Sequence, residues 1–185
     1  MRTALFVSAI FLSIPAWADD ALWASLKTEP YIIVLIRHTH TSGGNPLAWD
    51  ESGNCLNESV LSNKGKAQAH NIGEAFVMRD IKPNIISSPM CRCLETAKLA
   101  FNVPITTDPD LREVASANGD RMMNFENTAK TLIAKMRGNS PVVFISHRPN
   151  ISQLTMELIE QGELLVGRSN EKGEIDVLGK IVLHP

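Results

Sequence analysis

The chain lacks several features that would assign it to a special class of protein. Only three of its 185 residues are cysteines, and it contains no internal repeat, low-complexity tract or coiled-coil heptad. Its N-terminal apolar run is too short to span a bilayer comfortably. The formal net charge of −2 is close to balance, so nothing indicates nucleic acid or an anionic membrane surface as a partner. The 44% of hydrophobic residues supports a globular protein.

The first 18 residues are expected to be a signal peptide. Arg2 supplies a short positive start, residues 4–14 are apolar apart from two serines, and Ala16-Trp17-Ala18 fits the small-x-small pattern of a cleavage site. We therefore predict an exported chain, periplasmic or secreted, with a single domain over 19–185 and no stable membrane span after processing. A retained N-terminal anchor is the alternative. No cysteine lies directly after the cleavage site, which argues against a lipid anchor.

The three cysteines are Cys55, Cys91 and Cys93, and export permits a disulfide. Cys91 and Cys93 are two residues apart in a predicted helix, so their side chains point to different sides and should not bridge each other. A bond from Cys55 to either Cys91 or Cys93 would tie the loop over 41–57 to the helix. Three buried thiols acting as small hydrophobes are the alternative. A zinc site is disfavoured, because no second paired set of ligands is present.

Strand and helix patterns alternate along the rest of the chain. The apolar run over 31–36 contains four β-branched residues and is typical of a buried strand, and 142–145 has the same character. This alternation predicts an α/β fold, a three-layer α/β/α sandwich with a mostly parallel central sheet. The expected strands are 31–36, 85–87, 142–145 and, at the edge, 164–166 and 175–183. The expected helices are 65–79 with Ser62 as N-cap, one beginning with Ser88 as N-cap and Pro89 as first residue, 125–137 and 149–162, with 103–124 irregular.

Cationic and imidazole side chains follow three of these strands. Arg37 and His38 come directly after the first strand, Arg92 lies in the first turn after the second, and His147 follows the strand over 142–145. Right-handed crossovers bring the carboxyl ends of parallel strands to one edge of a sheet, which is where ligands bind in open α/β sheets. We therefore expect these four residues to form one site.

Such a site favours a phosphate dianion. Arginines present forked donors that match phosphate oxygens, and a helix N-terminus adds backbone N–H groups. A neutral imidazole among these cations can attack phosphorus, since neighbouring positive charges hold its pKa low. A phosphohistidine intermediate would divide one difficult displacement into two easier ones.

Four segments resemble motifs of the histidine phosphatase superfamily, which includes the phosphoglycerate mutases. Leu35-Ile36-Arg37-His38 resembles its Arg-His-Gly motif, and the segment 87–97 resembles its second-arginine motif. Leu61-Ser62 through Gly65 to Gln68-Ala69 resembles its first helix, and Phe144-Ile145-Ser146-His147 its second-histidine motif. The similarity covers about 31–183 and implies a phosphoglycerate mutase-like fold. The cysteine pattern and the Asn-Ile after the second histidine are similar to small exported bacterial members.

The resemblance implies a role for each matching residue. His38 would be the nucleophile that becomes phosphorylated. Arg37, Arg92 and His147 would hold the phosphoryl oxygens and stabilise the charge in transfer. Glu113, in Leu111-Arg112-Glu113, matches the placement of the acid in the mutase-like branch and would protonate the leaving group.

Other positions depart from the family pattern or offer an alternative acid. Thr39 and His40 replace the glycine and the acidic or polar residue that follow the first histidine, and we count both among the substrate-binding candidates. Arg148 stands where the acid-phosphatase branch has its aspartate, which disfavours that branch. Asp120 is the second candidate for the general acid.

The hypothesis that follows is a phosphomonoester hydrolase that works through phosphorylated His38 and needs neither metal nor cofactor. Its substrate would be a small-molecule or surface-attached phosphomonoester. A binding protein that keeps the phosphate site without turnover is the alternative, and a phosphomutase is third. These motifs leave the leaving group and the oligomeric state open.

Overall fold

The computed structural model describes residues 17–115 and 118–183. The predicted signal peptide therefore lies outside the described residues, apart from Trp17 and Ala18. These two residues begin helix α1 (Trp17–Thr28), and the predicted cleavage site falls within the first turn of that helix. In the described part of the chain, no helix combines the length and the apolar character needed to cross a membrane.

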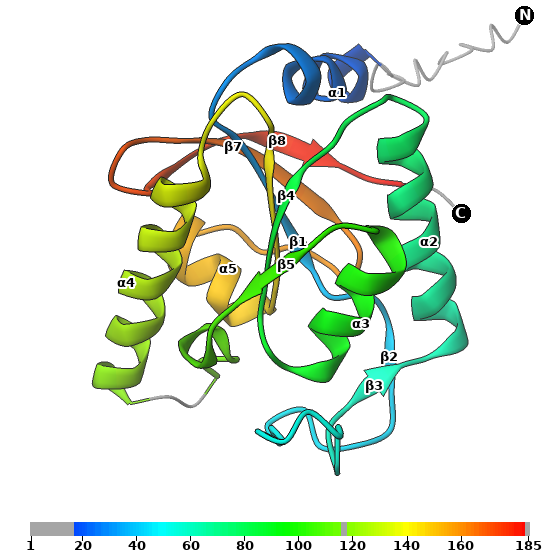
Figure 1. Ribbon diagram of the computed structural model, residues 1–185, viewed down its shortest axis with the longest axis vertical. Helices are drawn as coiled ribbons and strands as arrows, with labels where there is room; N and C mark the ends of the chain where they lie inside the picture. The colour runs from blue at the N-terminus through cyan, green and yellow to red at the C-terminus, as the bar shows by residue number, and fades with distance from the viewer. Residues whose placement is uncertain (1–16, 116–117, 184–185) are drawn as a thin grey trace, which may run out of the picture.

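A six-stranded sheet forms the centre of the domain (Figure 1), with the strand order β5-β4-β6-β1-β7-β8. β1, β4, β5 and β6 are parallel to one another, whereas β7 pairs antiparallel with β1 and β8 pairs antiparallel with β7. The prediction of a mostly parallel sheet in an α/β fold is therefore confirmed. The bounds of the strands are β1 Ile32–Arg37, β4 Asn84–Ser87, β5 Ile105–Thr107, β6 Val142–Ser146, β7 Leu164–Ser169 and β8 Ile175–Ile181.

Helices cover both faces of the sheet. Figure 1 shows α4 (Gly119–Met136) and α5 (Arg148–Thr155) to the left of the central strands, and α2 (Asn63–Val77) and α3 (Cys91–Ala100) to the right. Residues of alternate parity in β1 point to opposite faces, as the period of a strand requires. Ile32, Val34 and Ile36 pack with α1, α2 and α3, whereas Ile33 and Leu35 pack with α4 and α5. The result is the three-layer sandwich expected from the sequence.

Three helix boundaries differ from the sequence prediction. α3 begins at Cys91 rather than after Ser88, because the Ser88 N–H continues the sheet by donating to the Ile145 carbonyl. α4 begins at Gly119, with Asn118 as N-cap, so the segment expected to be irregular is partly helical. α5 ends at Thr155, because Met156 adopts a left-handed conformation.

The last strands of the sheet, the start of α2 and three short elements complete the fold. The sequence predicts β7 at the sheet edge, but it lies between β1 and β8, so only β8 is an edge strand at that end. Ser62 is the N-cap of α2 as predicted, since its Oγ accepts from the Gly65 N–H. β2 (Thr41–Ser42) and β3 (Val60–Leu61) form a small second sheet that encloses the loop after β1, and η1 (Pro109–Leu111) is a short 3₁₀ helix.

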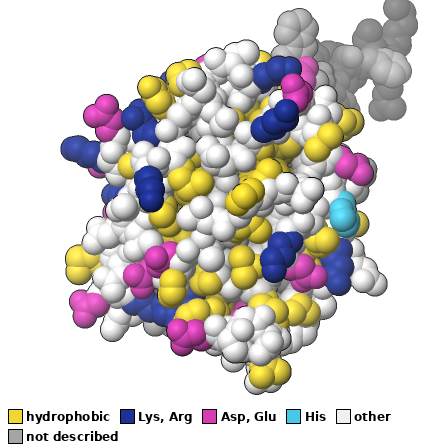
Figure 2. All heavy atoms as spheres, viewed as in Figure 1, with side chains coloured by type: hydrophobic (Ala, Val, Ile, Leu, Met, Phe, Trp, Pro, Cys, Tyr) yellow, Lys and Arg dark blue, Asp and Glu magenta, His cyan; other side chains and the backbone are white. Residues whose placement is uncertain are grey.

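Basic and acidic side chains are interspersed over the face of the molecule that Figure 2 shows. Hydrophobic side chains lie between them, and neither sign of charge forms a continuous surface on that face. This distribution matches the near-balanced net charge of the sequence.

Candidate active site

The register of the parallel strands brings the predicted site residues to one edge of the sheet. Arg37, the last residue of β1, pairs with Ser146, the last residue of β6. The His38 N–H then donates to the Ser146 carbonyl at 3.0 Å, which places His38 beside the residue that precedes His147. The rings of the two histidines are 5.5 Å apart between centroids. Arg92 reaches the same place from the first turn of α3.

His38 is held in one tautomer. Its Nδ1 lies 3.0 Å from the Thr39 carbonyl oxygen, and because a carbonyl can only accept, Nδ1 must carry the hydrogen. The neutral ring therefore has its lone pair on Nε2. Burial, together with the positive charges of Arg92 and Arg37, lowers the pKa of His38 to about 3, although the bond to the Thr39 carbonyl opposes the shift. His38 is thus a neutral imidazole with a defined free nitrogen at neutral pH.

Arg92 is the most completely buried cation of the site, with 1% of its surface exposed. Its Nη2 donates to the Pro46 carbonyl at 3.0 Å and to Glu113 Oε2 at 2.5 Å, and lies 3.1 Å from His147 Nδ1. Its Nη1 is buried and has no hydrogen-bond partner among the described residues. A buried guanidinium nitrogen without a partner retains an unused hydrogen-bond donor.

His147 is fully buried, and both of its ring nitrogens are engaged. Since arginine can only donate, Nδ1 accepts from Arg92, and Nε2 lies 2.7 Å from Ser88 Oγ. Burial, reinforced by the charge of Arg92, lowers the pKa of His147 well below its usual value, so the ring is neutral. In this arrangement His147 orients Arg92. The family resemblance predicts direct contact of His147 with phosphoryl oxygens; in the structure its ring nitrogens lie next to Arg92 and Ser88, and contact with phosphate stays a prediction.

Glu113 is the candidate acid that the structure brings to the site. Its Oε2 bonds to Arg92 and lies 3.8 Å from His147 Nδ1. Burial raises the pKa of Glu113, although the positive charge and the hydrogen bond of Arg92 oppose the shift. Asp120, the other candidate, is exposed in the first turn of α4. The geometry therefore favours Glu113 over Asp120.

Arg37 is partly buried, with 19% of its side chain exposed. Its Nη1 makes long contacts to the Ile159 carbonyl at 3.5 Å and to Glu160 Oε2 at 3.4 Å, and its buried Nε has no partner among the described residues. Burial lowers the pKa of Arg37, opposed first by Glu160, but a guanidinium stays charged at neutral pH. Weak contacts of this kind leave the guanidinium able to bind an anion.

The Thr39 and His40 side chains form hydrogen bonds within the protein. Thr39 is fully buried, and its Oγ1 bonds to Thr96 Oγ1 at 3.2 Å, so the hydroxyl already has a partner within the protein, and substrate binding by Thr39 stays a prediction. The Thr39 hydroxyl is hydrogen-bonded within the protein, and the Thr39 backbone carbonyl orients the His38 ring. The His40 ring bonds to Ser62 Oγ at 2.8 Å, and the backbone N–H of His40 donates to Gln68 Oε1 at 3.0 Å. His40 therefore lies against the start of α2.

The structure joins Cys55 to Cys91 and leaves Cys93 as a buried thiol. Of the two pairings that the sequence leaves open, the structure therefore has Cys55–Cys91. Cys93 lies 3.6 Å from His147 Nε2, and burial raises the pKa of its thiol to about 12. Cys93 is thus a neutral packing residue behind the site.

Sequence reasoning missed two residues that position the site. Asn150, fully buried in α5, accepts from the Val114 N–H at 3.0 Å and donates to the Arg112 carbonyl at 2.9 Å, so it clamps the segment that carries Glu113. Glu58 is 4% exposed; it accepts from the Cys91 N–H at 2.8 Å and holds the start of α3. A polar residue three positions after His147, in the first turn of a helix, was a signal for Asn150. Nothing in the sequence around Glu58 indicated its role.

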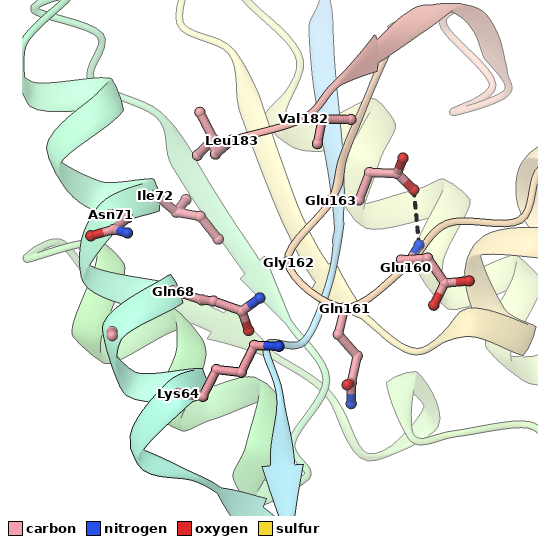
Figure 3. A pocket seen from close by; sticks show the side chains of 11 residues that line it. Lys64, Gln68, Asn71, Ile72, Glu160, Gln161, Gly162, Glu163, Val182 and Leu183 are labelled. Atoms are coloured by element: carbon pink, nitrogen blue, oxygen red, sulfur yellow. Dashed lines mark hydrogen bonds between the residues drawn. The ribbon is translucent and has the colours of Figure 1, made fainter. Parts of the chain in front are cut away.

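Two of the cavities in the described part of the structure lie near the candidate site. One of about 570 Å³ has Met90 and Glu113 in its wall. The other, of about 440 Å³, lies between α2, the segment 160–163 and the end of β8, and Figure 3 shows the side chains that line it. Among the described residues, no group of three or more His, Cys, Asp or Glu side chains is placed to hold a metal ion.

The carboxyl edge of this α/β sheet brings together two arginines and two histidines, side chains that suit the binding of an anion. The family model of the histidine phosphatase superfamily (branch 1) matches residues 33–137. The chain belongs to this superfamily. Among curated protein sequences no significant match is found.

Solved structures of the superfamily share the fold at low sequence identity. The protein histidine phosphatase SixA, complexed with tungstate, aligns with a TM-score of 0.56 and 13% identity over 81% of this chain and 96% of its own. Phosphoglycerate mutase from Thermus thermophilus aligns with a TM-score of 0.53 and 20% identity over 83% and 99%. A mycobacterial glucosyl-3-phosphoglycerate phosphatase aligns with a TM-score of 0.56 and 17% identity over 80% and 96%. The mutase-like fold predicted from the sequence is therefore confirmed.

Proposed function

We propose that the protein is a phosphomonoester hydrolase that works through a phosphohistidine on His38, without a metal ion. The observation that carries this proposal is the fixed tautomer of His38, which leaves Nε2 unprotonated in a site that also feels the positive charge of Arg92, whose Nη1 has no partner among the described residues. A neutral nucleophile in a site with an available guanidinium suits a phosphoryl dianion, since the cation neutralises charge that would otherwise repel attack.

The first half of the reaction transfers the phosphoryl group to the protein. His38 Nε2 attacks phosphorus, the bond from phosphorus to the leaving oxygen breaks, and Glu113 gives its proton to that oxygen. The raised pKa of Glu113 supports this role. A dianion bound at Arg92 would place more negative charge beside the carboxyl group and raise its pKa further, which favours the protonated form.

The second half regenerates the protein. Water attacks the phosphorus of phosphohistidine, Glu113 as carboxylate accepts a proton from the water, and the bond from phosphorus to Nε2 breaks to release phosphate. Arg37 and Arg92 hold the phosphoryl oxygens throughout, and His147 positions Arg92. SixA and the mycobacterial phosphatase are named for phosphatase activity, which supports hydrolysis as the reaction class.

The proposal extends to the location of the protein. We propose that residues 1–18 are removed as a signal peptide and that the mature domain acts in the periplasm or outside the cell. The Cys55–Cys91 disulfide supports this location, because such bonds persist in oxidising compartments.

The test measures hydrolysis of 4-nitrophenyl phosphate by the mature protein in the presence of a chelator. We expect turnover that falls by about 10³-fold or more in His38→Ala, as for loss of a nucleophile. His70→Ala is the matched control, because His70 is an exposed histidine on α2. Activity that is absent in the wild type, or unchanged in His38→Ala, would contradict the proposal.

The ion pair between Glu113 and Arg92 favours a second candidate function, a phosphate-binding protein without turnover. In the structure Arg92 Nη2 already has a carboxylate partner at 2.5 Å, so a bound anion competes with Glu113. This candidate predicts that phosphate raises the melting temperature while no acid-labile phosphoprotein can be trapped. Trapping a phosphoprotein in the wild type and not in His38→Ala would exclude it. A phosphomutase remains third, since the short stretch of sequence over 103–124 offers little for a cap that would close over a mutase substrate.

A further inference from the structure

We propose that the cavity beside Glu113 receives the leaving group, and that Arg112 and Arg121 select phosphomonoesters whose leaving group carries a second anionic group. This inference rests on the proposed function, because it takes Glu113 as the proton donor to the leaving oxygen. It adds a substrate class that the proposed chemistry does not specify.

The position of the cavity is the first argument. Met90 and Glu113 line its wall, and both contact Arg92: Glu113 Oε2 lies 2.5 Å and Met90 Sδ 3.5 Å from Arg92 Nη2. A leaving oxygen that takes its proton from Glu113 must lie next to this carboxyl group. The remainder of the leaving group then extends into the adjoining space, and about 570 Å³ is enough for a small organic group.

The charge of the cavity is the second argument. Arg112 and Arg121 both line it, and neither forms an ion pair within the described residues. Burial and the nearby Arg112 lower the pKa of Arg121, while Asp110 opposes the shift, so the two guanidinium groups are close enough to repel each other. Arg121 Nη2 donates to the Glu113 carbonyl at 2.7 Å, which uses one of its five N–H donors. The others can bind an anion.

The apolar part of the lining is the third argument. The Arg112 guanidinium lies 3.9 Å from the centre of the Trp49 ring, which holds the cation in place. Leu47, from the same loop, is 57% exposed at the cavity. An exposed leucine and an indole next to paired arginines suit a carbon skeleton that ends in a carboxylate, sulfate or phosphate.

The cavity of Figure 3 differs in charge from the cavity beside Glu113. It contains one lysine, Lys64, and two carboxylates, Glu160 and Glu163. Its charged side chains sum to a net negative charge, whereas Arg112 and Arg121 outweigh Glu113 in the cavity beside the acid. An anionic leaving group is therefore repelled from the cavity of Figure 3 and attracted to the cavity beside Glu113.

The experiment compares two esters of the same shape, 4-carboxyphenyl phosphate and 4-carbamoylphenyl phosphate. We expect kcat/KM to favour the carboxylate by about tenfold or more, the discrimination expected from one charge-assisted hydrogen bond. The preference should fall at least about threefold in Arg112→Gln and in Arg121→Gln, and disappear in the double variant. Lys82→Gln, which removes an exposed charge before β4, should keep it. The ratio of the two substrates cancels any general loss of activity in a variant.

A wild-type ratio near one, or a ratio that survives in the double variant, would overturn the inference while hydrolysis itself confirms the proposed function. If the wild type hydrolyses neither ester, the proposed function fails, and calorimetric binding of the same two esters then decides the selectivity. Tighter binding of the carboxylate ester that is lost in the double variant supports the subsite. Equal binding of the two esters rejects it.

Discussion

Removing the Cys55–Cys91 disulfide should destabilise the domain by several kcal/mol. The bond closes a loop with a sequence separation of 36 residues. The chain-entropy relation for a loop of this length gives about 4 kcal/mol at 25 °C, because the cross-link restricts the unfolded chain. We expect Cys55→Ser to lower the free energy of unfolding by about this amount in a urea titration, and to raise the slope with urea because its unfolded chain is more extended.

The site should respond as well, since the tethered loop carries the Pro46 carbonyl that accepts from Arg92 at 3.0 Å. We expect kcat/KM for an aryl phosphate to fall several-fold in Cys55→Ser under conditions where the variant is fully folded. The double variant Cys55→Ser/Cys91→Ser is the control: if loop closure dominates, its stability should lie within about 1 kcal/mol of the single variant. A loss below about 1 kcal/mol with an unchanged urea slope would refute the reasoning.

Further predictions concern pH, packing and positioning. Because the folded-state pKa of His38 is depressed to about 3, its stabilising contribution is present above about pH 6.5 and is lost as the pH falls towards 3. Between pH 7 and pH 5, the free energy of unfolding in urea titrations should fall by about 2 kcal/mol more for the wild type than for His38→Asn. Equal losses would contradict the buried neutral ring. The neutral ring of His147, fully buried, should add to the loss in the same direction. Gly65→Ala should cost about 3 kcal/mol or more in thermal unfolding, since a Cβ there would lie 1.9 Å from the His40 carbonyl oxygen; a neutral effect would show that α2 can shift. Asn150→Ala should cost about 3 kcal/mol by leaving buried backbone groups unpaired, and should lower kcat more than it raises KM; a loss of stability with unchanged kcat would deny it a positioning role.

Much of the fold could be predicted because local pattern and tertiary packing agree. The apolar run that forms β1 is buried along nearly its whole length, and Ser62 caps α2 as its position before a helical pattern indicates. The prediction failed where a tertiary bond overrode a local preference. Ser88 is a good N-cap by type, yet its N–H bonds to β6 and its hydroxyl to His147, so α3 begins at Cys91.

The site was predicted in its membership and less well in its contacts. Sequence order and strand ends correctly indicated that Arg37, His38, Arg92 and His147 would meet. The contacts of His147 depend on which neighbours reach its two ring nitrogens, and these are Arg92 and Ser88 rather than an open pocket. No spacing along the chain specifies such an arrangement.

The sequence by itself determined the class of fold, the family and the four residues at the sheet edge, because hydrophobic periodicity and short motifs are local properties of the chain. Tertiary structure alone decided which carboxylate faces Arg92, which cysteine pairs with Cys55, and where the Thr39 side chain points. Each of these depends on distances between segments that are remote in sequence. Glu113 reaches Arg92 from a segment whose backbone is held by Asn150 of α5 and by Arg121 of α4.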